Sequence, residues 1–204
     1  VDEESLELSI KIHKKEIFPF VGHFQAENLL SASMAVSALL DLDNVETLLK
    51  LKRFPGLPGR MEIVHATFKG ERRGFIVDFA HTPDALEKAL QTLKKGLKRG
   101  KLWVVFGCGG DRDPSKRPLM GQIASKYADK IVVTSDNPRS EDPDKIISEI
   151  VAPLEKAGLA YNKISSRKDA MLFCMERMSK DDMCLIAGRG HEEFQIVKEQ
   201  KIPF

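Results

Sequence analysis

The stretch Leu102-Trp-Val-Val-Phe106, with the polar run Gly107-Cys-Gly-Gly-Asp-Arg-Asp113 after it, decides the fold of this sequence. Five consecutive apolar residues without alternation indicate a strand that is buried on both faces, as in parallel sheets. Further short apolar runs occupy 131–134, 183–187 and 194–197. Helical periodicity is found between the runs, over 83–98, about 116–128, 143–157 and 168–178. Strands that alternate with helices predict βαβ units, so we expect an α/β fold with a mainly parallel sheet flanked by helices.

The chain before this pattern has different elements. Two strand-like runs at 61–68 and 74–79 flank a Lys69-Gly70 turn. The elements expected further upstream are one or two strands within 5–21 and helices over 24–40 and about 44–53. Between these two groups, Phe54-Pro-Gly-Leu-Pro-Gly59 has two prolines and two glycines in six residues. Such a segment interrupts regular structure, so we place a domain boundary there, with one domain over 1–57 and the other over 58–204.

Composition and charge exclude several classes of protein. The 204 residues are 42% hydrophobic and 30% charged, which is typical of a folded globular chain. The formal net charge is +2, without the basic excess of proteins that bind nucleic acid, so we expect no nucleic-acid partner. No run approaches 18 apolar residues, so we expect no membrane span. Cys108, Cys174 and Cys184 form no Cys-x-x-Cys pair, which favours reduced thiols and a cytoplasmic location.

Polar clusters follow four of the predicted strands, and they are the candidate functional segments. They lie at 78–83, 107–113, 135–139 and 188–193. In open α/β sheets, ligands bind beyond the carboxyl ends of the strands. We therefore expect these four segments to meet at one edge of the sheet.

Each segment also has a purely structural interpretation when it is taken alone. The glycines of 107–110 fit a tight turn, since they match neither the G-x-G-x-x-G fingerprint nor the P-loop. Asp136-Asn-Pro138 is a good turn sequence, and Arg139 after it could be a solvated surface charge. His191-Glu192 lacks the second histidine of a zinc protease. For the single segments, both interpretations stay open.

Taken together, the charges of these segments favour a ligand that carries both signs of charge. Arg112, Arg139 and Arg189 offer planar forks that suit carboxylates. Asp136 and Glu192 can hold an ammonium group. A small zwitterion meets both requirements.

Six motifs follow one another along the chain: Pro58-Gly-Arg-Met-Glu62, Asp78-Phe-Ala-His-Thr-Pro-Asp-Ala-Leu86, Val105-Phe-Gly-Cys-Gly-Gly-Asp-Arg-Asp113, Lys116-Arg-Pro-Leu-Met120, Asp136-Asn-Pro-Arg139 and Ala187-Gly-Arg-Gly-His-Glu192. This series resembles the Mur ligase family, whose members are ATP-dependent amide-forming ligases of peptidoglycan (cell-wall) biosynthesis. The Asp-Asn-Pro-Arg form is the mark of the members that add meso-2,6-diaminopimelate, through an acyl phosphate, to UDP-N-acetylmuramoyl-L-alanyl-D-glutamate. The resemblance extends over residues 28–200.

The resemblance implies a three-domain enzyme, with an N-terminal domain for the UDP-sugar, a central domain for ATP and a Rossmann-like C-terminal domain for the amino acid. Residues 1–57 would then be the tail of the central ATP-binding domain, and 58–204 most of the C-terminal domain. The family's phosphate-binding loop, magnesium ligands and carbamylated lysine would lie outside this sequence, in a longer enzyme. We therefore expect no catalytic or metal-binding residue here, ATP and Mg²⁺ bound mainly elsewhere, and no ligase activity from this chain alone.

The resemblance also assigns binding residues. The positions that match the diaminopimelate site are Arg112, Asp136, Asn137, Pro138, Arg139, Gly188 and Glu192. Arg139 would grip a carboxylate of the amino acid through two hydrogen bonds, and Glu192 would help to hold its ammonium group. The positions that match the ATP site are Asn28, Arg60 and Asp78. Phe79 departs from the family, which usually has tyrosine there, and it removes a hydroxyl near the nucleotide.

Three alternatives remain. A Mur-type ligase could add lysine or a dipeptide instead of diaminopimelate. A Rossmann-type dehydrogenase, or a non-catalytic module that binds a nucleotide or an amino acid, would account for the glycines of 107–110, although the absent G-x-G-x-x-G motif argues against a dinucleotide. A domain that only binds other proteins would have no small-molecule site.

Overall fold

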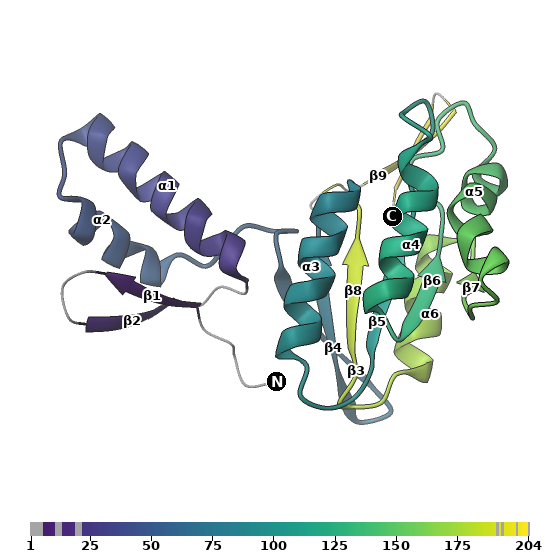
Figure 1. Ribbon diagram of the computed structural model, residues 1–204, viewed down its shortest axis with the longest axis horizontal. Coiled ribbons are helices and arrows are strands. Elements are labelled where there is room, and N and C mark those ends of the chain that lie inside the picture. Colours follow the sequence, from purple (N-terminus) through teal and green to yellow (C-terminus); the bar gives the residue numbers. More distant parts are fainter. Residues whose placement is uncertain are drawn as a thin grey trace. The chain divides into compact units, whose positions relative to one another are not determined.

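The chain divides into two compact units, Val1–Leu57 and Pro58–Phe204, in the computed structural model (Figure 1). The structure describes residues 6–10, 14–18, 22–190, 192, 194–198 and 200–203. The division falls inside the proline- and glycine-rich segment that follows Arg53. Each unit has its own sheet.

The first unit is a small antiparallel hairpin with two helices. Its elements are β1 (Leu6–Ile10), β2 (Lys14–Phe18), α1 (His23–Leu40), α2 (Asn44–Lys50) and the 3-10 turn η1 (Leu51–Arg53). The predicted strands and both predicted helices are confirmed. They could be predicted because the spacing of apolar residues and the cap of α2 are signals that lie within the local sequence. The Asp43 carboxylate accepts the Glu46 N–H at 2.8 Å and so caps α2.

The second unit is built on a six-stranded sheet in the order β3-β4-β8-β5-β6-β7. Its strands are β3 (Glu62–Phe68), β4 (Glu71–Asp78), β5 (Leu102–Phe106), β6 (Lys130–Val133), β7 (Asn162–Lys163) and β8 (Met183–Ala187). The edge strand β3 pairs antiparallel with β4, and all the other neighbours are parallel. The predicted mainly parallel α/β sheet is therefore confirmed.

Helices cover both faces of this sheet. They are α3 (Pro83–Gly96), α4 (Lys116–Tyr127), α5 (Pro143–Lys156) and α6 (Arg167–Arg177). Figure 1 shows α3, α4 and α5 on one face and α6 behind the sheet. The chain steps from β4 through β5 and β6 to β7 in one direction and returns to β8 in the other, so right-handed crossovers place α6 on the opposite face. All four helices begin and end within two residues of the predicted bounds.

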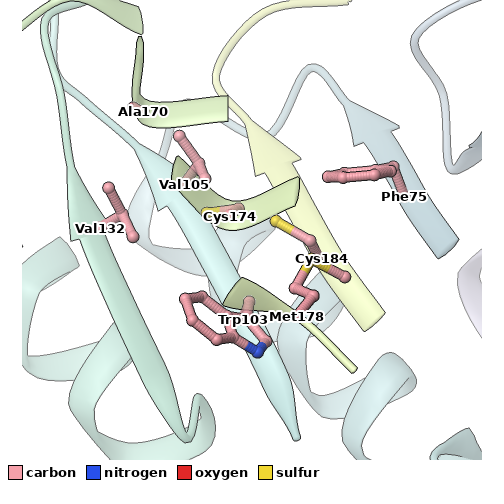
Figure 2. Packing of buried hydrophobic residues seen from close by; sticks show 8 residues of the cluster. All are labelled: Phe75, Trp103, Val105, Val132, Ala170, Cys174, Met178 and Cys184. Carbon is pink, nitrogen blue, oxygen red and sulfur yellow. The ribbon is translucent and has the colours of Figure 1, made fainter. Parts of the chain in front are cut away.

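Alternate residues of the central strands pack against the two helix layers. Trp103, Val105 and Cys184 face α6, where they meet Cys174 and Met178 (Figure 2). Leu102, Val104 and Phe106, with the opposite orientation along β5, are completely buried as well. The predicted double burial of β5 is thus confirmed, and the resulting rigid sheet holds the loops at its carboxyl edge.

Three features of the second unit differ from the sequence prediction. The run at 194–197 does not join the main sheet but forms β9 (Phe194–Val197), which pairs antiparallel with β10 (Gln200–Pro203). The two-residue strand β7 was too short to give a sequence signal. Burial on both faces does not extend to the edge strand β3, where Ile63 and Val64 are exposed. In the described part of the chain, no helix is both long and apolar enough to cross a membrane.

Candidate functional site

The loops that follow β4, β8, β5 and β6 lie next to one another at the carboxyl edge of the sheet, since these four strands are consecutive neighbours. Backbone hydrogen bonds join the loops in pairs. The Gly188 N–H donates to the Asp78 carbonyl at 3.1 Å, and the Gly110 N–H donates to the Asn137 carbonyl at 2.8 Å. The four polar segments singled out in the sequence therefore surround one edge.

The loops after β5 and β6 approach so closely that they require a glycine. A Cβ on Gly110 would lie 1.9 Å from the Pro138 carbonyl oxygen, a distance that no side chain tolerates. Pro138 itself is buried. This contact, with the Gly110–Asn137 hydrogen bond, fixes the position of one loop against the other.

Arg139 lies half-buried between these two loops. Its backbone is left-handed, with φ +52°, and is held by hydrogen bonds with Ile196 and Lys198. Its Nη1 donates to the carbonyls of Gly110 at 2.7 Å and Asn137 at 3.4 Å. The hydrogen bonds that the Arg139 side chain makes to described residues all come from Nη1, so Nε and Nη2 have no partner among these residues. These two nitrogens form one edge of the guanidinium, and such an edge can bind a carboxylate with two parallel hydrogen bonds.

Arg112 lies close to Arg139, although the two residues come from different loops. A Cβ on Gly109 would be 2.9 Å from Arg139 Nη1 and 3.9 Å from Arg112 Cγ. Arg112 is exposed, and its Nη1 donates to the Asp111 carbonyl at 3.1 Å. The guanidinium of Arg139 and the aliphatic stem of Arg112 therefore flank Gly109, which has no side chain.

Asp136 is engaged by the chain itself, in contrast to the expectation that it holds an ammonium group. It is buried; Oδ1 accepts the Asn137 N–H at 2.6 Å, and Oδ2 lies 3.9 Å from Arg167 Nη1. Burial lowers the pKa of Arg167, and the charge of Asp136 partly offsets this effect. Asp136 is thus the counter-ion of a buried arginine. It also packs against Gly188, where a Cβ would lie 2.9 Å from its Oδ2.

Asn137 and Arg189 join the loop after β6 to the segment after β8. Asn137 Oδ1 accepts the Ile196 N–H at 2.6 Å and an N–H of Arg189 at 3.3 Å. Arg189 is buried and also donates to the Phe194 carbonyl. Burial lowers the pKa of Arg189, while Asp136 and Glu192 counteract that shift. Nη1 and Nη2 of Arg189 therefore hold the protein itself, and its expected role as a fork for a ligand carboxylate stays a prediction.

Glu192 lies half-buried in the same segment, and its Oε2 accepts the Gly190 N–H at 2.7 Å. Its charge acts on both Arg167 and Arg189. His191 and Glu193 lie outside the described residues. One cluster of opposite charges is thus formed by Asp136 and Glu192 with the buried Arg167 and Arg189. Asn137 joins this cluster through its hydrogen bond with Arg189.

Two of the three residues expected at the ATP site lie together at the end of β4. The Asp78 carboxylate accepts the N–H groups of Met61 at 2.9 Å and Ala80 at 2.8 Å. Burial raises the pKa of Asp78, and these hydrogen bonds and Arg60 only partly counteract it. The Arg60 guanidinium lies 4.7 Å above the Phe79 ring. This stacking needs no phenol hydroxyl, so Phe79 serves it as well as tyrosine would.

Asn28, the third of these residues, belongs to the first unit. It is exposed on α1 and donates to Gln25 at 3.4 Å.

The part of the chain that the structure describes has no group of three histidine, cysteine, aspartate or glutamate side chains that could hold a metal ion. The cysteines do not supply a nucleophile either. All three are buried, and burial raises the pKa of Cys108 to about 12.

Sequence reasoning missed two buried arginines next to the site. Arg117 lies under the loops after β5 and β6 and binds Glu141 and Glu149, and Arg167 lies behind Asp136. Arg117 is the second residue of the Lys116-Arg-Pro motif, which was the available signal. Arg167, at the first turn of a polar helix, gave no signal that separates it from a surface residue.

Comparisons with known proteins show which family this chain resembles. Residues 59–190 match the family described as "Mur ligase, glutamate ligase domain". A UDP-N-acetylmuramoyl-L-alanyl-D-glutamate–2,6-diaminopimelate ligase of Rickettsia conorii is 46% identical over 190 residues, which is 91% of this chain and 37% of that protein. The ligase of the same name from Prochlorococcus marinus is 45% identical over 195 residues, 93% of this chain and 37% of the relative. The chain thus spans little more than a third of the length of these relatives.

Solved structures give the same result. A structure of a UDP-N-acetylmuramoyl-L-alanyl-D-glutamate–2,6-diaminopimelate ligase matches 95% of this chain and 39% of its own, with 38% identity and a TM-score of 0.67. A UDP-N-acetylmuramate-alanine ligase of Thermotoga maritima shares the fold over 86% of this chain and 36% of its own, with 23% identity and a TM-score of 0.62. From the family match, the related sequences and the shared fold, we conclude that the chain belongs to the Mur ligase family.

Proposed function

We propose that this chain is the amino-acid-binding part of a ligase that joins meso-2,6-diaminopimelate to UDP-N-acetylmuramoyl-L-alanyl-D-glutamate in peptidoglycan synthesis. The observation that carries the proposal is the pair Arg112 and Arg139, which meet at Gly109 from two separate loops. An amino acid with a carboxylate and an ammonium at each end is complementary to two guanidiniums with Glu192 on the adjoining segment. The relatives that match nine-tenths of the chain carry the name of this activity.

The reaction is the formation of an amide bond at the expense of ATP. The D-glutamate carboxylate takes the γ-phosphoryl group of ATP, which gives an acyl phosphate and ADP. The amine of diaminopimelate then attacks the carbonyl carbon and loses a proton, and inorganic phosphate leaves with the electrons of the broken C–O bond. The contribution of this chain is to bind and orient the amine, because a well-oriented nucleophile removes much of the entropic barrier.

The described residues divide this work. Arg139 binds a carboxylate of diaminopimelate through Nε and Nη2, and Arg112 adds a second positive charge beside it. Glu192 faces the ammonium group. Asp136, Asn137 and Pro138 set the shape of the loop, as their internal hydrogen bonds and burial indicate. Gly188 allows Asp136 to pack closely, because a Cβ there would lie 2.9 Å from Asp136 Oδ2.

The proposal includes the assignment of the two units. Residues 58–204 form most of the amino-acid-binding domain, and 1–57 the tail of the ATP-binding domain. Asn28, Arg60 and Asp78 would contribute to the ATP site, with Mg²⁺ held mainly by ligands outside the described residues. The reaction takes place in the cytoplasm, where the three buried thiols stay reduced.

The test uses the full-length ligase that contains these residues, supplied with ATP, the UDP-linked dipeptide precursor and either meso-diaminopimelate or L-lysine. ADP release and the mass of the product are measured. We expect kcat/KM for meso-diaminopimelate to exceed that for L-lysine by at least about a hundredfold, because lysine leaves the arginines without a second carboxylate. We expect no ADP release from the 204-residue chain alone. Equal use of the two amino acids, or turnover with neither, would refute the proposal.

A further inference from the structure

Arg117 is almost completely buried, with 1% of its surface exposed, under the two loops that carry Arg112 and Arg139. Its guanidinium makes two parallel hydrogen bonds to Glu141, from Nη1 at 3.0 Å and Nη2 at 2.8 Å. Nη1 also donates to Glu149 at 2.7 Å, and Nη2 reaches the Gly109 carbonyl at 3.5 Å. A residue of α4 therefore holds the loop after β5, the loop after β6 and helix α5 at once.

Glu141 extends this connection across the two loops. The same Oε1 that binds Arg117 accepts the Asp111 N–H at 2.6 Å. The hydrogen bonds from Arg117 and Asp111 hold the pKa of Glu141 below its ordinary value, so it stays charged. Asp111 also binds the loop after β6 through its side chain. Its carboxylate accepts hydrogen bonds from the Ser140 hydroxyl at 2.6 Å and from the Ser140 N–H at 3.2 Å.

The residues that are tied in this way are the immediate neighbours of the two arginines. Asp111 precedes Arg112, and Ser140 follows Arg139. Both Asp111 and Arg139 have left-handed backbones, with φ +52° each, which only surrounding contacts can maintain in residues other than glycine. The positions of the loop segments that carry Arg112 and Arg139 thus depend on the Arg117–Glu141 pair.

We propose that Arg117 and Glu141 are positioning residues that set the spacing of Arg112 and Arg139 and thereby the affinity for the diaminopimelate carboxylates. This inference rests on the proposed function and deepens it. Neither residue touches the substrate; the pair acts through the backbone of Asp111 and through Ser140. A displacement of a binding group by about 1 Å can cost a factor of about a hundred.

The chain offers a matched control in Glu149. It binds the same guanidinium from α5 at 2.7 Å, with a side chain about as exposed as that of Glu141, 34% against 25%. Among the described residues, its one recorded hydrogen bond is the one from Arg117, and it has no bond to either loop. If Arg117 has a purely structural role, Glu141→Gln and Glu149→Gln should have equal effects on KM for the amino acid. If Arg117 positions the loops, only Glu141→Gln should raise this KM.

The experiment measures KM for meso-diaminopimelate, KM for ATP, kcat and Tm in the full-length ligase. For Glu141→Gln we expect KM for the amino acid to rise about tenfold or more, with KM for ATP within about twofold of the wild type. For Glu149→Gln we expect a comparable loss of Tm and an unchanged KM for the amino acid. Arg117→Lys, which keeps the charge and loses the fork, should raise KM for the amino acid as Glu141→Gln does.

Ser140→Ala is the variant to use if Glu141→Gln does not fold, since Ser140 is exposed. It removes the hydroxyl bond to Asp111, and we expect KM for the amino acid to rise about threefold with no change in Tm, as for the loss of one exposed hydrogen bond. Equal KM values for Glu141→Gln and Glu149→Gln, or an unchanged KM in Ser140→Ala, would refute this inference alone. A wild-type ligase that makes no amide with diaminopimelate would refute the proposed function and the inference together.

Discussion

At the scale of the residue, the candidate site depends on where hydrogen-bond donors are already used. The Nη1 of Arg139 holds the loop of Gly110, which leaves the opposite edge of its guanidinium for a ligand. Arg189 carries the same charge but is buried with its donors turned to the protein. The sequence could identify both arginines as candidates, but it could not separate them, because burial is decided by tertiary contacts.

The first prediction concerns Arg139→Lys in the full-length ligase. Lysine keeps the charge but has neither the fork for a carboxylate nor the geometry to hold the Gly110 carbonyl at the same time. We expect kcat/KM for meso-diaminopimelate to fall about a hundredfold or more, with KM for ATP little changed. Steady-state kinetics check this result, with Arg99→Lys on the exposed loop before β5 as the control. Unchanged turnover would remove Arg139 from the site.

The second prediction concerns Gly188→Ala. The φ of Gly188 is +95°, and a Cβ would lie 2.9 Å from Asp136 Oδ2, so alanine would meet both backbone strain and crowding. Gly158→Ala is a matched control, because Gly158 has φ +65° with nothing within 4 Å of its Cβ. We expect about 1–2 kcal/mol of destabilisation in the control from the backbone alone. Gly188→Ala should lower the free energy of unfolding by more than the control does, and it should also weaken amino-acid binding. Equal losses of unfolding free energy for the two variants, measured in urea, would show that the side chain of Asp136 does not crowd a Cβ at position 188.

At the scale of the element, strands and helices were predictable where local signals agreed. The α3 bounds followed from the Thr82 cap, Pro83 and the buried leucines at helical spacing. The antiparallel pairing of β9 was not predictable, because its apolar residues look like those of the parallel strands, and only its contacts with the loop after β6 distinguish it. The convergence of the four polar segments was predictable from the βαβ pattern, since it follows from parallel strand direction.

The third prediction concerns Asp182, which joins the amino ends of β5 and β8. Its carboxylate accepts four hydrogen bonds: from Lys101 N–H at 2.8 Å, Trp103 Nε1 at 3.0 Å, and the Ser179 N–H and hydroxyl at 3.0 and 2.9 Å. Burial by itself would raise the pKa of Asp182, but these bonds outweigh it and leave the pKa lowered. A lowered pKa means that the stabilisation is complete above the ordinary value, and that it is lost as the pH falls through the folded-state pKa.

We therefore expect Asp182→Asn to lower the free energy of unfolding by about 2–3 kcal/mol at pH 7. The difference from the wild type should begin to shrink as the pH falls below the ordinary aspartate pKa of about 3.9, where the unfolded chain takes up its proton, and should be lost only below the lower pKa of the folded state. Urea unfolding of the 204-residue chain at pH 7 and pH 3.5 measures both values. If the difference in unfolding free energy between the two proteins stays constant with pH, the charge of Asp182 does not contribute to the stability of the fold.

At the scale of the whole molecule, the two units differ in how they bury apolar residues. Among the residues whose burial the structure describes, which exclude 1–21, most of the buried apolar side chains lie within 58–204. Helix α1 of the first unit leaves Leu30, Met34 and Leu39 exposed, Leu39 at 83%. Exposed apolar side chains that gather on one helix favour association with another surface. The sequence pattern indicated the helix, but the extent of its exposure depends on packing.

The fourth prediction follows from this contrast. We expect residues 58–204, produced alone, to unfold cooperatively with the same Tm as the corresponding transition of the 204-residue chain, because their core is their own. We expect the 204-residue chain to self-associate more strongly than 58–204 as concentration rises. Calorimetry and analytical ultracentrifugation measure these properties. A non-cooperative 58–204, or equal association of the two chains, would contradict the division into units.

The most direct test of the account is a crystal structure of the full-length ligase with bound meso-diaminopimelate. We predict the amino acid at the carboxyl edge of the sheet, with one carboxylate accepting two hydrogen bonds from Nε and Nη2 of Arg139, Arg112 beside it, and Glu192 facing an ammonium group. An amino acid bound away from the segments 107–113, 135–139 and 188–192, or with Arg139 turned from both of its carboxylates, would contradict the account.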